Sequence, residues 1–328
     1  MTHRILANRA LGILSHFFDL RSDITTWLIP SNICFSVPFL LISKNIHFEM
    51  FDFGFELESI FHAAGGNPKK TTGVILVNHY GMLWEQDTIK QVNDSFGALI
   101  IDACLSAPEI SPPSNLTGDL LLFSTGKGKI VELGFGAIAY TQNPIVLQKD
   151  SNDCEPLQKR YEWLDDYWKE RLKSGANLDP KICLEIPWVD LGTHKIGNPK
   201  TYLSQVSSTL EKELLHRKLI NDVYDTLISK DLIWNSKSNL WRYHLWIDNP
   251  EEAISGLFEK NLFASRHYAN AAMRFKKSGK FQKSILIENH IVNLFNSRQI
   301  DLDFAEKCAK TVESLRKLGK IKPGPPLI

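Results

Sequence analysis

The sequence lacks several features that mark particular classes of protein. Its 38 basic and 37 acidic residues leave a formal charge of +1, so no strong field attracts it to nucleic acid or to an anionic membrane. The longest apolar stretch, residues 33–42, is only about ten residues long and contains Pro38, which is too short to cross a bilayer. We therefore expect small-molecule substrates, no nucleic acid partner and no membrane span.

Cysteines are few, and none are paired in the sequence. The five cysteines form no C-x-x-C pair of the kind that a zinc site or a redox motif needs, so we expect no metal site. The first residues lack the continuous apolar core and small-residue cleavage site of a signal peptide. These absences favour a cytoplasmic protein with reduced thiols. The cysteines are Cys34, Cys104, Cys154, Cys183 and Cys308.

What the sequence has is the composition of a folded globular protein, with 328 residues of which 43% are hydrophobic. Up to residue 141, short apolar runs alternate with helix-like stretches, which is typical of an α/β fold with a buried sheet. The runs are continuously apolar, so helices are expected on both faces of the sheet. The predicted strands are Thr26–Ile29, His47–Phe51, Gly73–Asn78, Ala98–Ile101, Asp119–Phe123 and Ala137–Thr141.

The rest of the chain predicts a second, smaller unit. We expect a large domain over residues 1–200 and a small α+β domain over residues 201–328, joined by a long charged helix near residues 202–228. An amphipathic packing helix is predicted at 158–173, and the proline-rich end at 322–326 is expected to be a loose tail. In the small domain we predict strands at Trp241–Ile247 and Leu262–Tyr268 around a helix at Pro250–Lys260.

Two polar residues follow predicted strands, where ligands of open α/β sheets bind. Asp102 ends one apolar run, where it would serve either in a site or as an ordinary helix cap or turn residue. Ser124 ends the next run and opens a glycine-rich stretch whose N–H groups could hold a phosphate. The nucleotide-triphosphatase pattern is absent, because Lys129 is followed by Ile130 rather than by Ser or Thr.

Lys129 is the third candidate. A lysine in a partly desolvated site can lose its proton near neutral pH and react with an aldehyde, although a solvated loop lysine is the commoner case. A carboxylate such as that of Asp102 could keep a pyridine nitrogen protonated, which is what makes pyridoxal 5'-phosphate (PLP) an electron sink.

Residues 73–141 resemble the sugar aminotransferases of the DegT/DnrJ/StrS type. The resemblance is carried by the order and spacing of Asn78-His79-Tyr80-Gly81, the Asp-Ala-Cys turn at 102–104, Ser124, Lys129 and Gly134-Phe135-Gly136. It implies the PLP-dependent transferase fold type I, with a large α/β/α domain and a small C-terminal α+β domain. It further implies that Lys129 holds PLP and carries protons, that Asp102 pairs with the pyridine nitrogen and that Ser124 binds the phosphate.

Weaker similarity extends over nearly the whole chain and adds further candidates. It makes residues 7–10 the start of a phosphate-binding helix, with Asn8 and Arg9 as cofactor ligands, and adds Phe35 as the ring-stacking residue and Cys104 beside Asp102. The substrate-binding candidates are His79, Arg266 and His267. Arg266 could grip a carboxylate in bidentate fashion or be an ordinary surface arginine.

The implied activity is transfer of an amino group from an amino acid, glutamate being expected, to a keto group of a nucleotide-linked sugar, by a homodimer. The sequence departs from the family at Leu105, where Gln or His is usual, and in its short N-terminus. These departures leave two alternatives: another PLP-dependent reaction such as elimination, or a non-catalytic homologue of the same fold.

Overall fold

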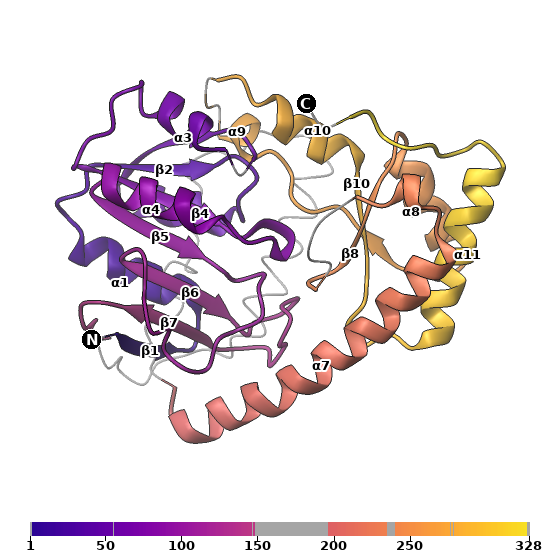
Figure 1. Ribbon diagram of the computed structural model, residues 1–328, viewed down its shortest axis with the longest axis horizontal. Coiled ribbons are helices and arrows are strands. Elements are labelled where there is room, and N and C mark those ends of the chain that lie inside the picture. The colour runs from indigo at the N-terminus through magenta and orange to yellow at the C-terminus, as the bar shows by residue number, and fades with distance from the viewer. Residues whose placement is uncertain are drawn as a thin grey trace.

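Two β-sheets organise the molecule (Figure 1). The computed structural model describes residues 2–54, 56–145, 147, 196–234, 240–275, 277 and 279–326. The helix predicted at 158–173 and two of the cysteines, Cys154 and Cys183, lie outside the described residues. Within them, no helix is both long and apolar enough to cross a membrane.

The larger sheet has seven strands in the order β1-β7-β6-β5-β4-β2-β3. All pairs are parallel except those that involve β7, which runs antiparallel to both β1 and β6. Each of the six strands predicted up to residue 141 is observed within one residue of its expected ends. The strands are β1 His3–Ala7, β2 Thr26–Pro30, β3 His47–Phe51, β4 Thr72–Val77, β5 Ala98–Asp102, β6 Leu120–Ser124 and β7 Ala137–Thr141.

Strand β1 was not predicted. Its residues pair with β7, Ala7 opposite Ala137, so the first helix begins at Ala10 and not at Ala7 as the resemblance implied. Arg9, the residue before the helix, is still extended, with φ −150° and ψ 146°. The strand escaped prediction because its first residues, His3 and Arg4, are polar and only its inward positions are buried.

Helices cover both faces of the larger sheet, as its continuously apolar strands predicted. Side chains of β4 alternate between two apolar clusters: Ile75 and Val77 pack on one face, and Val74 and Leu76 on the other. The first face is covered by α1 (Ala10–Leu20) and α2 (Ser36–Ser43), and the second by α3 (Leu57–Ala63) and α4 (Gln86–Ser95). The α/β/α fold class inferred from the sequence is confirmed.

A three-stranded antiparallel sheet lies in the C-terminal part, in the order β8-β10-β9. It consists of β8 (Tyr243–Trp246), β9 (Ala264–Ser265) and β10 (Ile291–Leu294). The strand predicted at Leu262–Tyr268 is thus shortened to two residues, and beyond them His267 N donates to the Asn293 side chain. The sheet shares an apolar core with α7 (Pro199–Leu227), α8 (Pro250–Phe258) and α11 (Leu302–Lys317).

Short elements complete the described chain. One-turn helices occupy His79–Gly81 and Lys230–Leu232, and α9 (Ala271–Arg274) and α10 (Gln282–His290) connect β9 to β10. Figure 1 shows α7 extending from the side of the larger sheet to the small sheet. In and next to α9, Ala271, Ala272 and Phe275 belong to the apolar cluster that α1 and α2 form with the larger sheet. The chain therefore packs against the larger sheet again before it forms β10.

The C-terminal segment is attached, contrary to the expected loose tail. Lys322 O accepts a hydrogen bond from Asp248 N at 2.9 Å, and Gly324 N donates to Trp246 O at 3.1 Å. The indole of Trp246 also donates to Pro325 O at 2.7 Å. A proline lacks an N–H group but keeps its carbonyl, so an extended proline-rich chain can still accept hydrogen bonds from a neighbouring segment.

The loop from Thr125 to Gly136, which carries Lys129, is closed at its base. Thr125 N donates to Gly136 O at 2.9 Å, and the Thr125 hydroxyl contacts both Phe135 O and the Tyr202 hydroxyl of α7. Gly136 has φ +99°, and a Cβ atom there would lie 2.5 Å from both Thr125 Oγ1 and Tyr202 Cε2. Only glycine fits this position, because it needs no Cβ.

We expect Gly136→Ala to destabilise the protein more than the control Gly134→Ala. Gly134 also has a positive φ, +79°, but a Cβ there would meet nothing within 4 Å. The control should therefore cost about 1–2 kcal/mol of backbone strain, and Gly136→Ala about 1–3 kcal/mol more for the clash. Urea unfolding of the two variants measures the difference. Equal losses would show that the base of the loop is not tightly packed.

Candidate cofactor site

The carboxyl ends of β4, β5 and β6 place the first candidate residues in a row. Val77 pairs with Asp102, which pairs with Leu122, so Asp102 and Ser124 end neighbouring parallel strands. Asn78 N, just past β4, donates to Asp102 O at 2.9 Å. The strand interiors are apolar, so this edge is where the sheet presents polar side chains.

Asp102 is buried and held in position. Its Oδ1 accepts a hydrogen bond from Cys104 N at 2.9 Å, which fixes the carboxylate above the turn that follows β5. Burial raises the pKa of the Cys104 thiol well above its usual value, and the charge of Asp102 raises it further. The thiol is therefore neutral at pH 7. Cys104 contacts Asp102 through its backbone N–H group.

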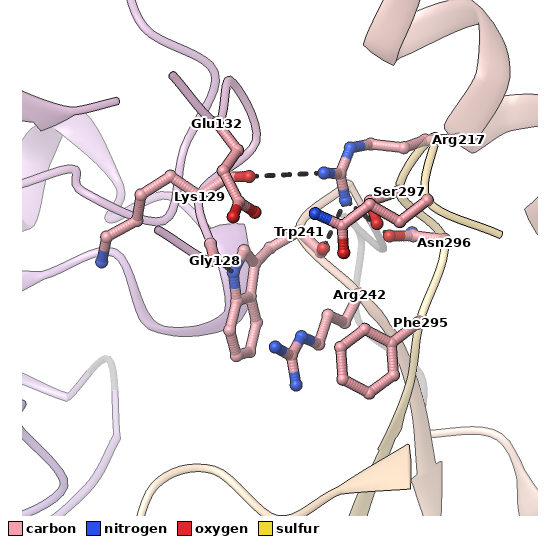
Figure 2. Close-up of a pocket in the computed structure, with 10 residues that line it drawn as sticks. Gly128, Lys129, Glu132, Arg217, Trp241, Arg242, Phe295, Asn296 and Ser297 are labelled. Atoms are coloured by element: carbon pink, nitrogen blue, oxygen red, sulfur yellow. Dashed lines mark hydrogen bonds between the residues drawn. The ribbon is translucent and has the colours of Figure 1, made fainter. Parts of the chain in front are cut away.

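Lys129 lies on the loop after β6 and is half-buried. Its positive charge lowers the pKa of Cys104, while the charge of Asp102 raises it, so both charges act on the same buried thiol. Figure 2 shows the Lys129 side chain extending away from Arg217, while its backbone carbonyl faces Arg217. The structure thus brings Lys129 and Asp102 around Cys104.

Ser124 lies beside the N-terminus of α1. Ser124 pairs with Ala137, and Ala137 pairs with Ala7, so the residues that follow β1 emerge at the same edge as Ser124. Asn8 O accepts a hydrogen bond from Gly136 N at 2.7 Å, and burial lowers the pKa of Arg9 to about 10. Ser124 Oγ accepts from Gly126 N at 3.2 Å. The Ser124 hydroxyl and the N-terminus of α1 thus lie at the same edge of the sheet, which is a place suited to an anion.

Sequence reasoning missed the residues that hold the segment after β9. Tyr80, at φ 57°, accepts a hydrogen bond from Tyr268 N through its hydroxyl at 2.9 Å. Asn32 Nδ2 donates to Tyr268 O at 3.0 Å, and the imidazole Nε2 of His79 donates to Asn32 O at 2.9 Å. Burial raises the pKa of Tyr268, and Asp102 is among the charges that raise it further. Tyr268 therefore lies near the carboxylate, and its place in the Ser-Arg-His-Tyr run was the signal available in the sequence.

Both histidine candidates are uncharged at pH 7; His79 is buried, and His267 is partly buried. Burial lowers the pKa of His79 to about 4 and that of His267 to about 3. The positive charges of Arg242 and Lys129 lower the pKa of His267 further. The contact that His79 makes is its hydrogen bond to Asn32 O, which is a structural contact. Its assignment to substrate stays a prediction.

Arg266 and Phe35 have other contacts. The Arg266 guanidinium forms an ion pair with Glu251 and donates to Glu288 O. The Phe35 ring packs edge-on against Phe275, with centroids 6.1 Å apart. The assignments of Arg266 to substrate and of Phe35 to the cofactor ring stay predictions.

A small pocket adjoins the lysine loop on the side of the C-terminal sheet (Figure 2). Arg217 of α7 spans its wall: the guanidinium donates to Trp241 O and Asn296 Oδ1, both at 2.6 Å, and to Ile130 O at 3.3 Å. Glu213, one turn earlier, forms an ion pair with it at 3.3 Å. The lining residues are Gly128, Lys129, Glu132, Arg217, Trp241, Arg242, Phe295, Asn296, Ser297 and Gln299.

Comparisons with known proteins place this geometry in context. The sequence matches no protein-family model and no curated protein. Among solved structures, the chain is similar to Spr1654 from Streptococcus pneumoniae, described as a sugar aminotransferase, in its PMP form. The TM-score is 0.67 at 16% identity, over 96% of this chain and 88% of that one.

Other similar structures carry related descriptions. A DegT DnrJ EryC1 StrS aminotransferase from Brucella abortus gives a TM-score of 0.66 at 13% identity, over 95% of this chain and 86% of that one. PseC from Helicobacter pylori, an aminotransferase involved in the biosynthesis of pseudoaminic acid, gives 0.66 at 12% identity, over 96% and 87%. The chain therefore has the fold of the sugar aminotransferases of the DegT/DnrJ/EryC1/StrS type.

Proposed function

We propose that this protein is a PLP-dependent aminotransferase that moves an amino group from an amino acid, with glutamate as the expected donor, to the keto group of a nucleotide-linked sugar. The observation that carries the proposal is the arrangement of Asp102, Ser124 and Lys129 at the carboxyl ends of β5 and β6. Similarity to aminotransferase structures supports the reaction type. The donor and the sugar rest on the family resemblance alone.

The described residues fit PLP in the chemistry they offer. Lys129 supplies an amine for the aldehyde, and Asp102 supplies a buried carboxylate for the pyridine nitrogen. Ser124, Gly126 N and the segment of Asn8 and Arg9 supply donors for the phosphate. When bound, PLP supplies an electron sink for negative charge at the α-carbon of the substrate.

The protein's own part is to hold charges and move a proton. The hydrogen bond from Cys104 N keeps the Asp102 carboxylate in place without neutralising it. The neighbouring Cys104, His267 and Tyr268 are neutral at pH 7 by their shifted pKa values, so they do not compete with Asp102 for a cationic partner. Lys129 Nζ would take the proton from the donor's α-carbon in the first half-reaction and, in the second, would supply a proton to the acceptor carbon that gains the amino group.

The site differs from the family pattern at one position. Leu105 is buried in an apolar cluster with Tyr80, Ile130 and Trp241, so it offers no polar contact where the family usually has Gln or His. A homodimer in the cytoplasm, with an amino acid donor and a keto-sugar acceptor as its small-molecule partners, completes the proposal.

We expect PLP to attach to Lys129. The purified protein with added PLP should develop the absorption band of lysine-bound cofactor, and borohydride should make the bond permanent. Peptide mapping should find the label on Lys129 in the wild type and in Lys127→Ala, and lose it in Lys129→Ala. Lys127 lies on the same loop but is exposed, so a label there would refute the assignment.

Asp102→Asn should keep the fold and lose most of the activity. The amide oxygen can still accept the hydrogen bond from Cys104 N, but the anionic partner of the pyridine nitrogen is gone. Loss of one such electrostatic group lowers turnover by about a hundred- to a thousandfold. Single-turnover rates with a donor, measured on a variant with unchanged melting temperature, test this. Wild-type rates would make Asp102 an ordinary turn residue.

The reaction type is tested by a half-reaction. PLP-loaded protein is mixed with glutamate, glutamine, alanine or aspartate while its absorption is monitored. Transamination predicts conversion to the aminated cofactor with at least one donor and reversal by the matching keto acid. Nucleotide-sugar amines serve as reverse substrates. If the loaded protein is silent in both directions, the aminotransferase proposal is wrong, and an elimination enzyme or a non-catalytic homologue becomes the better explanation.

A further inference from the structure

Asn78 and Ser106 form a polar pair beside Asp102. Asn78 Nδ2 donates to Ser106 Oγ at 3.2 Å. Asn78 comes directly after β4, and its backbone N–H donates to Asp102 O at 2.9 Å. Ser106 N donates to Ala103 O at 2.9 Å, which closes the turn that follows β5. The two side chains therefore lie next to Asp102, at the carboxyl edge of the larger sheet.

The hydroxyl of Ser106 has a hydrogen to offer. Its oxygen accepts the hydrogen bond from the Asn78 amide, and within the described chain no residue accepts a hydrogen bond from it. Ser106 is partly exposed, whereas Asn78 is only 5% exposed, so the hydroxyl is the accessible end of the pair. A hydroxyl oxygen can accept one hydrogen bond while its hydrogen is donated to another group. The pair is thus suited to bind an acceptor oxygen next to Asp102.

The strand order decides which oxygen of PLP would reach this pair. Ser124, Asp102 and Asn78 lie at the carboxyl ends of the neighbouring strands β6, β5 and β4, in this order. On the pyridine ring of PLP, the nitrogen lies opposite the carbon that bears the aldehyde. The phosphate arm and the phenolic oxygen flank that carbon on opposite sides. With the nitrogen at Asp102 and the phosphate arm on the side of Ser124, the phenolic oxygen falls on the side of Asn78.

We propose that the Ser106 hydroxyl, held in place by Asn78, donates a hydrogen bond to the phenolic oxygen of PLP, a role that rests on the proposed function. That oxygen carries negative charge beside the bond to Lys129, so a donor there stabilises the charge. Leu105 packs in an apolar cluster and offers no polar group for this contact. Ser106 supplies the donor from the next residue of the same turn.

The contact has a spectroscopic consequence. Lysine-bound PLP changes its absorption when the nitrogen that joins it to the lysine loses its proton. That loss leaves the negative phenolic oxygen without a cationic N–H group beside it. A hydrogen bond to the more strongly charged form favours that form, so the Ser106 hydroxyl moves the midpoint of the absorption change to lower pH. Removal of the hydroxyl therefore moves the midpoint to higher pH.

The test is a pH titration of the PLP-loaded protein, followed by absorption and without an amino donor. Ser106→Ala should raise the midpoint by about one to two pH units, the equivalent of one hydrogen bond to a charged group. Asn78→Ala should raise it less, because the hydroxyl remains but loses its support. Ser106→Thr keeps a hydroxyl and should titrate as the wild type does. Ser43→Ala is the control, because its partly buried hydroxyl lies at the end of α2 that leads to the start of β3.

A second measurement separates the contact from any effect on folding. Ser106→Ala should bind PLP about ten- to a hundredfold more weakly than the wild type does. Both proteins should bind equally an analogue of PLP that lacks the phenolic hydroxyl, because the analogue cannot make the contact. The ionisable groups around the site are the same in all these variants, so they do not account for a difference between them. They are Asp102, Cys104, Lys129, Arg242, His267 and Tyr268.

An unmoved midpoint in Ser106→Ala, or an equal loss of affinity for PLP and for the analogue, would overturn the proposal. A shift in Asn78→Ala with none in Ser106→Ala would also overturn it, since the amide would then make the contact. These results leave the proposed function intact while borohydride still labels Lys129, and absence of that label from the wild type would refute both. A shifted midpoint with a silent half-reaction would refute the proposed function and leave the contact of Ser106 standing.

Discussion

The buried guanidinium of Arg217 is the interaction on which the shape of the candidate site depends. It comes from α7 and donates to carbonyls of the lysine loop, to Trp241 O just before β8 and to Asn296 after β10. Three separated segments thus share one cation, which Glu213 balances. Removing a buried charge that satisfies several carbonyls leaves each of them unpaired at the same time. Together with the hydrogen bond from the Trp241 indole to Gly128 O at 2.8 Å, this side chain ties the loop of Lys129 to the small sheet.

Few groups around the site carry charge at neutral pH. Burial keeps the imidazoles of His79 and His267 deprotonated and the thiol of Cys104 protonated, by the directions of their pKa shifts. Among the charges that remain, the carboxylate of Asp102 lies on the side of the larger sheet and the guanidinium of Arg242 on the side of the smaller one. Under the proposed function, a protonated pyridine ring would find its complementary charge at Asp102, which is how electrostatic preorganisation works in enzymes.

The two arginines of the small-sheet region show why residue type alone is a weak guide to function. Arg266 stands in a motif-like run, and the sequence made it the candidate for a carboxylate. In the structure its guanidinium forms an ion pair with Glu251 and donates a hydrogen bond to a backbone carbonyl of α10. Arg242 has no motif around it, yet it lies between two aromatic rings beside the lysine loop. Whether an arginine is free to bind a ligand depends on its ion-pair and hydrogen-bond partners. These partners come from distant parts of the chain.

The sequence by itself determined the larger sheet and the row of polar residues at its edge. Short continuous apolar runs bounded by turn residues are typical of strands buried on both faces, and the polar residue that ends such a run emerges at the edge, which located Asp102 and Ser124. The tertiary structure alone decided β1, the short β9, the attached C-terminal segment and the contacts of Arg242, Asn32 and Tyr268. Each of these depends on pairing between residues far apart in the chain, and local hydrophobic periodicity contains no information about which distant group will be the partner.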